Sequence, residues 1–395
     1  MTRIPALEWL LGRASIELGD AWRVTRCERC GRDFLSRSGQ SPCFSRSCTS
    51  HALRLRPRST PLDGGALWRR LSQHFGNAGF TTPTPRPIVN PTGETLFTSA
   101  ALQVIDPVVH EGAPRHEEPM IVAQAVIRLN STDAVGLPEG FSTSFVNIGT
   151  EQVVRTFDAF GAHLGAWLAG LRSVGLEHSR LCLIAEPVRF RGGRYEGWYL
   201  VLDHGGIEMG EAIAIDTVRG HPGMKVLDFG FGLERILWAV NGTPTYYDSI
   251  GPLSERLEGH VALVDAARTA MLMAMTGIEP GHRSHGYRMR QAVGRLADQV
   301  DGFDVPERVL LHSYDYWSSF LVPTVPPAES LHVIGLELMR RTNLRLCRDL
   351  GIEPPAGSTT SPPDSFIEHL LTRGITYGEL LSARQGAAHG GRAHR

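Results

Sequence analysis

The segment Asp228-Phe-Gly-Phe-Gly-Leu-Glu-Arg235 decides how this chain is interpreted, because it joins the end of a predicted strand to the start of a predicted helix. Leu233, Leu237 and Val240 continue from it as one apolar stripe at helical spacing. The glycines would let a ligand approach the backbone, and the guanidinium of Arg235 can hold a phosphate and cover an aromatic ring. A Gly-rich turn without a ligand is the alternative, because Gly-x-Gly alone is a weak signal.

Apolar runs bounded by Gly, Pro and Asp surround this segment and predict a sheet. The expected strands cover residues 120–129, 141–148, 181–184, 198–202 and 207–215. A long helix with an apolar stripe that starts at Phe157 is expected between the second and third of these strands. Because strands and helices do not alternate regularly, the sequence predicts an α+β fold in which helices flank the sheet.

The chain has 395 residues, more than one core usually supports, so several domains are expected. They are an N-terminal element at 1–60, a main domain at 61–255, a helical domain at 256–350 and a flexible tail with one short helix at 351–395. No apolar run is long enough to span a bilayer, and the first 20 residues contain Glu8 and Glu17. We therefore expect a cytoplasmic protein without a membrane partner. The formal net charge of −1 neither supports nor excludes contact with RNA.

Four of the six cysteines lie close together near the N-terminus. Cys27 and Cys30 form one pair, and Cys43 and Cys48 form a second pair. Four thiolates close a tetrahedral Zn²⁺ site that has no open position for water, so the spacing predicts a structural zinc site in a zinc-ribbon-like element. His51 is a further candidate ligand, and four unrelated cysteines are the alternative.

With its continuation to Asp248, the segment 228–235 resembles motif 3 of the archaeal-type alanyl-tRNA synthetases, which are class II aminoacyl-tRNA synthetases. Other segments resemble further parts of that family in order. They are 26–34 for the N-terminal zinc element, 96–103 for the motif 1 region, 126–136 and 142–145 for motif 2, and 283–290 for the start of a helix in the tRNA-facing domain. The resemblance implies a class II antiparallel sheet, flanked by helices and followed by a helical domain.

The resemblance also implies a role for individual residues. The expected ATP-binding residues are Arg128, Phe145, Glu208, Gly232 and Arg235. Arg128 would clamp the α-phosphate, Phe145 and Arg235 would hold the adenine between them, and Glu208 would hold Mg²⁺. Arg128 and Arg235 would also be catalytic, because fixed arginines stabilise the charge that develops on phosphorus. Without the resemblance, Arg128 fits a structural ion pair, Phe145 the core and Glu208 a solvated strand edge.

Asp228 would receive the α-ammonium group of the amino acid, with Glu211 in the same pocket. The family has Asn or Thr at the position of Glu211. A carboxylate there disfavours a nearby substrate carboxylate, so the resemblance leaves open an amino acid other than alanine. A surface position for Glu211 is the alternative.

Other departures concern motif 2 and the tRNA contacts. Gly140 and Phe141 stand where the family has an Arg-His pair, and Val146 where it has Glu, which affects the tRNA step more than adenylation. The chain also lacks the paired His motifs of the family's editing domain. The tRNA-facing candidates are Arg283, Arg288 and Arg295, for which a solvated helix face is the alternative.

We therefore expect an enzyme that makes an aminoacyl-adenylate from ATP and alanine, or another small amino acid, and transfers the aminoacyl group to tRNA. A small molecule, a peptide or a carrier protein is the alternative acceptor. A catalytically inactive paralogue that binds tRNA or an amino acid is the alternative to an enzyme. The expected cofactors are ATP, Mg²⁺ and structural Zn²⁺.

Overall fold

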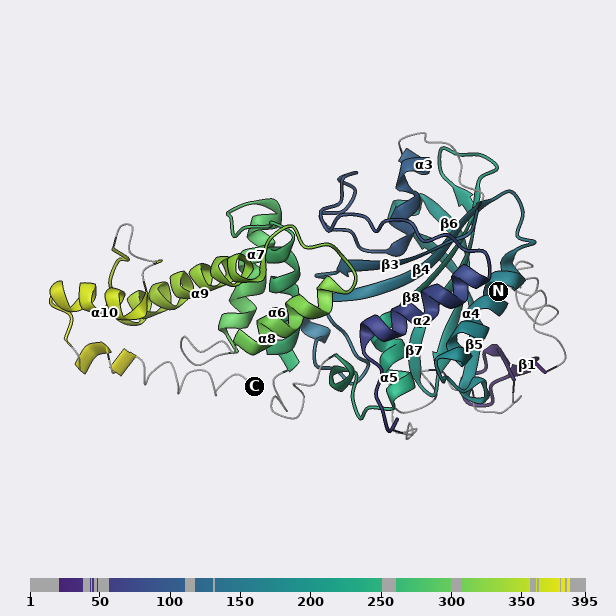
Figure 1. Cartoon of the computed structure of the whole chain (residues 1–395), viewed down its shortest axis with the longest axis horizontal. Coiled ribbons are helices and arrows are strands. Elements are labelled where there is room, and N and C mark those ends of the chain that lie inside the picture. Colours follow the sequence, from purple (N-terminus) through teal and green to yellow (C-terminus); the bar gives the residue numbers. More distant parts are fainter. Residues whose placement is uncertain are drawn as a thin grey trace. The chain divides into compact units, whose positions relative to one another are not determined.

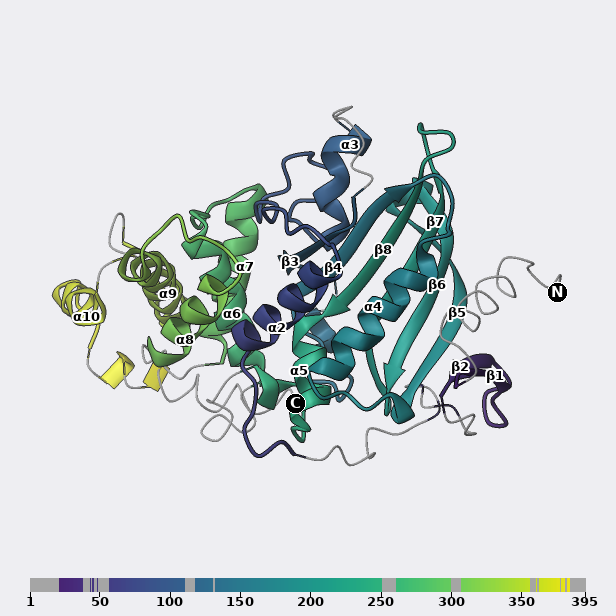
Figure 2. The same cartoon turned by 45° about the vertical axis from the view of Figure 1, so that its right-hand side comes forward.

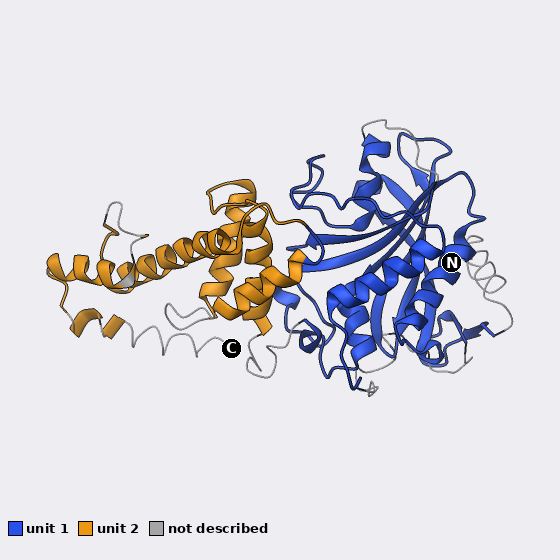
Figure 3. Ribbon diagram, viewed as in Figure 1, with its two compact units in different colours: residues 1–254, 319–321 blue, residues 255–318, 322–395 orange. Residues whose placement is uncertain are grey.

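The computed structural model describes residues 21–37, 43, 45, 48, 57–110, 118–130, 132–250, 261–299, 307–355, 360, 362–376, 378–380 and 382–383. The chain divides into two compact units (Figure 3). Unit 1 contains residues 1–254 and 319–321, and unit 2 contains residues 255–318 and 322–395. Within the described ranges, no helix has both the length and the apolar character that crossing a membrane requires. The candidate ligand His51 lies outside these ranges.

Unit 1 is built on one eight-stranded sheet with the order β1-β2-β5-β6-β7-β8-β4-β3 (Figures 1 and 2). Its strands are β1 (Arg23–Arg26), β2 (Asp33–Ser36), β3 (Met120–Ile127), β4 (Ser144–Val154), β5 (Leu181–Phe190), β6 (Tyr195–His204), β7 (Ile207–Val218) and β8 (Lys225–Gly232). All neighbouring strands run antiparallel. The predicted α+β fold with an antiparallel sheet is therefore confirmed.

Helices cover one face of this sheet, as Figure 2 shows for α2 and α4. The helices of this layer are α2 (Gly64–Asn77) and α4 (Phe160–Ser173), and α5 (Leu233–Asn241) follows β8 directly. Phe229 and Phe231 of β8 are fully buried beneath α4. Phe231 stacks on Trp167 with ring centroids 3.9 Å apart, and Phe229 meets Phe160 edge-on at 5.2 Å. Burial of these rings holds the middle of the sheet against the helices.

The opposite face of the sheet is only partly covered. Two short helices, η1 (Ala101–Ile105) and α3 (Asp106–His110), bury Leu102 and Val108 in one core cluster with Ile213 and Val226. This cluster covers the part of the face near the start of β8 and leaves the part from Asp228 to Gly232 to line a pocket. The remaining short helices of unit 1 are η2 (Thr132–Ala134), η3 (His178–Arg180), η4 (Arg191–Gly193) and η5 (Tyr247–Ser249).

Unit 2 is helical in its described residues. It contains α6 (Val261–Met275), α7 (Ser284–Ala297), α8 (Glu307–Ser318), α9 (Pro327–Asp349) and α10 (Pro363–Thr372). Most side chains of α6 are buried, including Arg268, whose guanidinium lies 4.1 Å from the ring centroid of Tyr316 and 4.7 Å from that of Trp317. At the end of α9, Cys347 packs with Phe366 of α10.

Several predicted boundaries differ from the structure. The strand predicted at 141–148 is Ser144–Val154, because β4 pairs with β3 over residues 144–151 and with β8 over residues 147–154. The helix with the predicted stripe begins at Phe160, so Phe157 lies before it. Arg128, expected within a strand, follows the last residue of β3.

Candidate functional site

The segment 228–235 forms the floor of a pocket in unit 1, of about 580 Å³. Its first five residues belong to β8 and its last three begin α5, so it is a strand that passes directly into a helix and not a turn. Side chains alternate along a strand. Phe229 and Phe231 therefore point into the helix-covered core, while Asp228, Gly230 and Gly232 face the pocket.

The strands beside β8 set what surrounds these three residues. On β7, Glu211 is opposite Gly230. On β4, Asn147 is opposite Gly232 and Glu151 is opposite Asp228. The Asn147 side chain is held on both sides, because its Oδ1 accepts from the Ala101 N–H at 2.8 Å and its Nδ2 donates to the Phe231 carbonyl at 3.3 Å. A Cβ at position 230 would come within 3.3 Å of that Nδ2, so glycine keeps the floor open.

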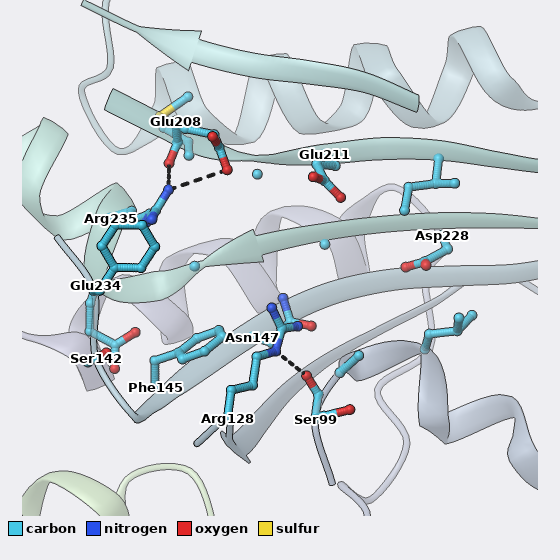
Figure 4. Close-up of a pocket in the computed structure, with 18 of the residues that line it drawn as sticks. Ser99, Arg128, Ser142, Phe145, Asn147, Glu208, Glu211, Asp228, Glu234 and Arg235 are labelled. Atoms are coloured by element: carbon cyan, nitrogen blue, oxygen red, sulfur yellow. Dashed lines mark hydrogen bonds and ion pairs between the residues drawn. The ribbon is translucent and has the colours of Figure 1, made fainter. Parts of the chain in front are cut away.

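Arg128 and Phe145 line the pocket from the neighbouring ends of β3 and β4 (Figure 4). The Arg128 guanidinium lies 5.0 Å from the centroid of the Phe145 ring, a cation–π distance. Its Nε donates to the Ser99 carbonyl at 2.7 Å. The guanidinium is therefore aimed across the ring toward the pocket.

Arg235 lies in the first turn of α5 and reaches Glu208 of β7. Its Nη1 donates to the Glu208 carbonyl at 2.6 Å and lies 3.5 Å from the Glu208 carboxylate, and its Nη2 donates to the Gly140 carbonyl at 3.3 Å. The guanidinium is 5.7 Å from the ring centroid of Phe141. The structure therefore brings Arg235, Phe145 and Glu208 into one pocket, but it pairs Arg235 with Phe141 and Phe145 with Arg128.

Asp228 faces a second carboxyl, that of Glu151, which has no exposed surface. Neither Glu151 oxygen has a donor partner among the described residues, and the two carboxyls hydrogen-bond to each other when one is protonated. Burial and the Asp228 charge raise the pKa of Glu151 well above its usual range. Burial also raises the pKa of Asp228 to about 6. The hydrogen bond between them raises the pKa of Glu151 and lowers that of Asp228, so Glu151 is the partner that holds a proton more readily.

Glu211 is the next acid along this face. Burial and, to a smaller extent, the charges of Glu208 and Asp228 raise its pKa to about 7, while the charges of Arg128 and Arg235 oppose the shift. Glu211 is half-buried and lines the pocket, so it is not the solvated surface residue of the alternative interpretation.

An ionic network that includes the buried Asp106 meets the pocket at Arg191. Arg191 lines the pocket and lies 3.1 Å from a carboxylate oxygen of Asp106 and 3.3 Å from one of Glu94, and Arg194 also pairs with Glu94 at 2.8 Å. Arg191 has a φ of 49°, in the left-handed region, which costs free energy for a residue other than glycine.

Sequence reasoning missed Arg191, Asn147 and Glu151. The period of two that starts at Phe145 would place Asn147 on the pocket face within the predicted strand, so the signal for Asn147 was present. The same period would place Glu151 there, but the predicted strand ended at Ile148. For Arg191 no sequence signal pointed to the pocket.

The departures in motif 2 have local structural reasons. Gly140 has a φ of 72°, and a Cβ there would come within 2.6 Å of the Tyr246 side chain, so this position requires glycine. Val146 is fully buried, and its N–H donates to the buried Glu234 carboxylate at 3.1 Å. Alternation along β4 directs the Val146 side chain away from the pocket.

The four N-terminal cysteines converge in unit 1, where all their sulfur atoms lie within 4.8 Å of one another. The Sγ atoms of Cys27 and Cys48 are 3.8 Å apart, as are those of Cys30 and Cys43. A tetrahedral ion with Zn–S bonds of about 2.3 Å requires about this separation. The cluster therefore fits the predicted closed zinc site. It also lies far along the sheet order from β8, because β1 and β2 form the sheet edge beyond β5.

The predicted tRNA-facing arginines lie on α7 of unit 2. Arg283 is the exposed residue before the helix, and Arg288 is exposed and donates to Gln291 at 2.7 Å. Arg295 forms a 3.0 Å ion pair with the buried Asp265 of α6, so it also holds two helices together.

No protein-family model matches this chain. It is 24% identical over 380 residues to an alanine–tRNA ligase of Methanothermobacter thermautotrophicus, covering 88% of this chain and 41% of the relative. It is 26% identical over 236 residues to that of Methanosphaera stadtmanae, covering 56% of this chain and 26% of the relative. The chain therefore spans about two fifths of the first relative's length.

Among solved structures, the pyrrolysyl-tRNA synthetase of Desulfitobacterium hafniense has 14% sequence identity and a TM-score of 0.35, covering 51% of this chain and 76% of that chain. By sequence, the chain is distantly similar to the alanine–tRNA ligases.

Proposed function

We propose that the pocket binds ATP and an amino acid and joins them into an aminoacyl-adenylate. The observation that carries this proposal is the convergence of Arg128, Phe145, Asp228 and Arg235 on one pocket, although these residues come from three separate parts of the sequence. The distant similarity to alanine–tRNA ligases supports the same chemistry. The pocket volume of about 580 Å³ is in the range of small-molecule sites.

The reaction needs positioning and charge stabilisation but no nucleophile from the protein. An oxygen of the amino-acid carboxylate attacks the α-phosphorus of ATP, the bond to the bridging oxygen breaks, and pyrophosphate leaves. Arg128 and Arg235 would stabilise the charge on phosphorus. Glu208 would hold Mg²⁺ together with the phosphates, a common arrangement for that ion.

Binding of ATP requires a rearrangement of Arg235. In the structure its guanidinium lies over Phe141 and bonds to the carbonyls of Glu208 and Gly140. For adenine to lie between Phe145 and Arg235, the guanidinium must leave Phe141. Both arginines reach their present partners through backbone carbonyls, which phosphate oxygens can replace as stronger, charged acceptors.

By the same similarity we propose tRNA as the acceptor of the aminoacyl group. A small molecule, a peptide and a carrier protein are the competing acceptors. Incubation with ATP, the activated amino acid and each class of acceptor, followed by mass detection of the product, separates them.

The first test is amino-acid-dependent exchange of pyrophosphate into ATP. We expect exchange in the native chain and a loss of about 100- to 1,000-fold in Arg235→Ala, because one fixed donor at a developing charge is worth that much. Arg189→Ala is the matched control, since Arg189 is an exposed arginine of the same sheet that pairs with Glu196. Absence of exchange with every amino acid tried would overturn the proposal.

A further inference from the structure

The charges that line the pocket are unequally partnered. The three arginines each have a partner: Arg128 donates to Ser99, Arg235 to Glu208, and Arg191 pairs with Asp106. The carboxylate of Glu208 is also near a cation, since Arg235 lies 3.5 Å away.

Two other carboxyls of the pocket, those of Asp228 and Glu211, are not paired with a cation in this way. Within the described residues, neither Glu211 nor Asp228 forms an ion pair with Lys, Arg or His. Asp228 has only 6% of its surface exposed, and it faces another acid, Glu151. A buried carboxylate that is not paired with a cation is costly, and the hydrogen bond between Asp228 and Glu151 brings no positive charge. The missing partner in this part of the pocket is therefore a cationic group.

The sheet register places the carboxyls of Asp228 and Glu211 close enough for one small ligand to contact both. Asp228 pairs with Ile213 and Gly230 pairs with Glu211, so Asp228 and Glu211 are diagonal neighbours on adjacent strands and on the same face. Diagonal neighbours have Cα atoms about 7–8 Å apart. Because Gly230 has no side chain, nothing on β8 separates the two, and Figure 4 shows both carboxylates turned toward the pocket. One short ligand with two cationic groups can therefore contact both.

Arg191 determines which way such a ligand must point. It lies at the Asp228 end of the pocket, and its Nη2 is buried with no hydrogen-bond acceptor among the described residues. A second cation placed beyond Asp228 would meet this guanidinium. A second cation directed toward Glu211 would not.

Building on the proposed function, we propose that the amino-acid substrate is a short-chain diamino acid, whose α-ammonium binds Asp228 and whose side-chain ammonium binds Glu211. Glu211 is then a specificity residue that selects the second amino group. The class includes 2,4-diaminobutyrate and ornithine. Norvaline is nearly isosteric with 2,4-diaminobutyrate and has a methyl group in place of the second ammonium.

The test compares these two isosteres by pyrophosphate exchange with the whole 395-residue chain. We expect kcat/KM for 2,4-diaminobutyrate to exceed that for norvaline by about 10- to 100-fold, the value of one charge-assisted hydrogen bond. Glu211→Gln should reduce this ratio to about one. Glu196→Gln should keep it, because Glu196 is an exposed carboxylate on β6 that pairs with Arg189.

Calorimetric titration of both isosteres without ATP separates this proposal from the proposed function. Tighter binding of 2,4-diaminobutyrate that depends on Glu211, without exchange, would support the diamino-acid site and overturn adenylation. Exchange that prefers norvaline or alanine would overturn the diamino-acid site and support adenylation. If Glu211→Gln changes the Mg²⁺ requirement but leaves the substrate ratio intact, Glu211 is a metal ligand and the proposal is wrong.

Discussion

Replacement of Asp228 by asparagine should stabilise the folded protein while it abolishes amino-acid activation. Asp228 is almost fully buried and faces the buried carboxyl of Glu151. Burial raises the pKa of Asp228 from 3.8 to about 6, so its ionisation is harder in the folded than in the unfolded chain. Asparagine removes that charge, and its amide can donate to Glu151.

The expected size follows from the pKa. A difference between 3.8 and about 6 corresponds to about 3 kcal/mol, because each pH unit is worth about 1.4 kcal/mol. For an acid whose pKa is raised on folding, the cost is absent below the unfolded pKa and grows as pH rises. The gain in unfolding free energy for Asp228→Asn should therefore be near zero at pH 4, rise between pH 4 and 6, and level off at on the order of 3 kcal/mol above that.

Urea unfolding from pH 4 to 8, followed by tryptophan fluorescence, measures this difference. Asp216→Asn is the control, because Asp216 is an exposed carboxylate of β7 in an ion pair with Lys225, and its removal should change stability by less than about 1 kcal/mol. An Asp228→Asn variant that is less stable than the native chain at pH 7.5, or a gain that does not depend on pH, would refute the assignment of a buried, costly charge. Pyrophosphate exchange on the same samples should show lost activity despite the higher stability.

Three further predictions concern the rest of the molecule. Phe145→Ala should raise the KM for ATP about tenfold, while Phe145→Tyr keeps it near the native value, because stacking on a base needs the ring. The purified chain should hold one zinc ion per molecule, as measured by elemental analysis. Cys43→Ser should lose the zinc and lower the Tm in a thermal melt, whereas Cys347→Ser, in unit 2, should retain the metal. For 2,4-diaminobutyrate, kcat/KM should rise as pH increases through about 7, because burial and the charges of Glu208 and Asp228 raise the pKa of Glu211 to about 7 and only ionised Glu211 attracts the second ammonium. A rise of equal size for norvaline would contradict this prediction.

Local patterns were enough to predict much of the fold. The segment 228–235 was predicted to join the end of a strand to a helix with the stripe Leu233, Leu237 and Val240, and β8 and α5 meet within that segment. The cysteine spacing predicted a cluster that the structure shows with suitable separations. Both features depend on residues near one another in the chain, so periodicity and spacing are sufficient to detect them.

Predictions that depended on the ends of elements were less accurate. The strand that carries Phe145 was predicted to stop at Ile148, but it continues to Val154. The continuation is stabilised by hydrogen bonds to β3 and β8, which no local pattern of this segment encodes. As a result Glu151 was not expected in the site.

The segment from Asp228 to Arg235 shows most directly which features local sequence predicts and which depend on tertiary structure. The sequence by itself determined that its glycines and its two charged ends belong to one strand–helix unit. Only the tertiary structure decided what the charged ends meet: Asp228 faces Glu151, with Glu211 diagonal to it, and Arg235 reaches Glu208. These contacts arise from strand register between segments far apart in the chain. A shift of one residue in that register would turn every one of these side chains to the other face of the sheet.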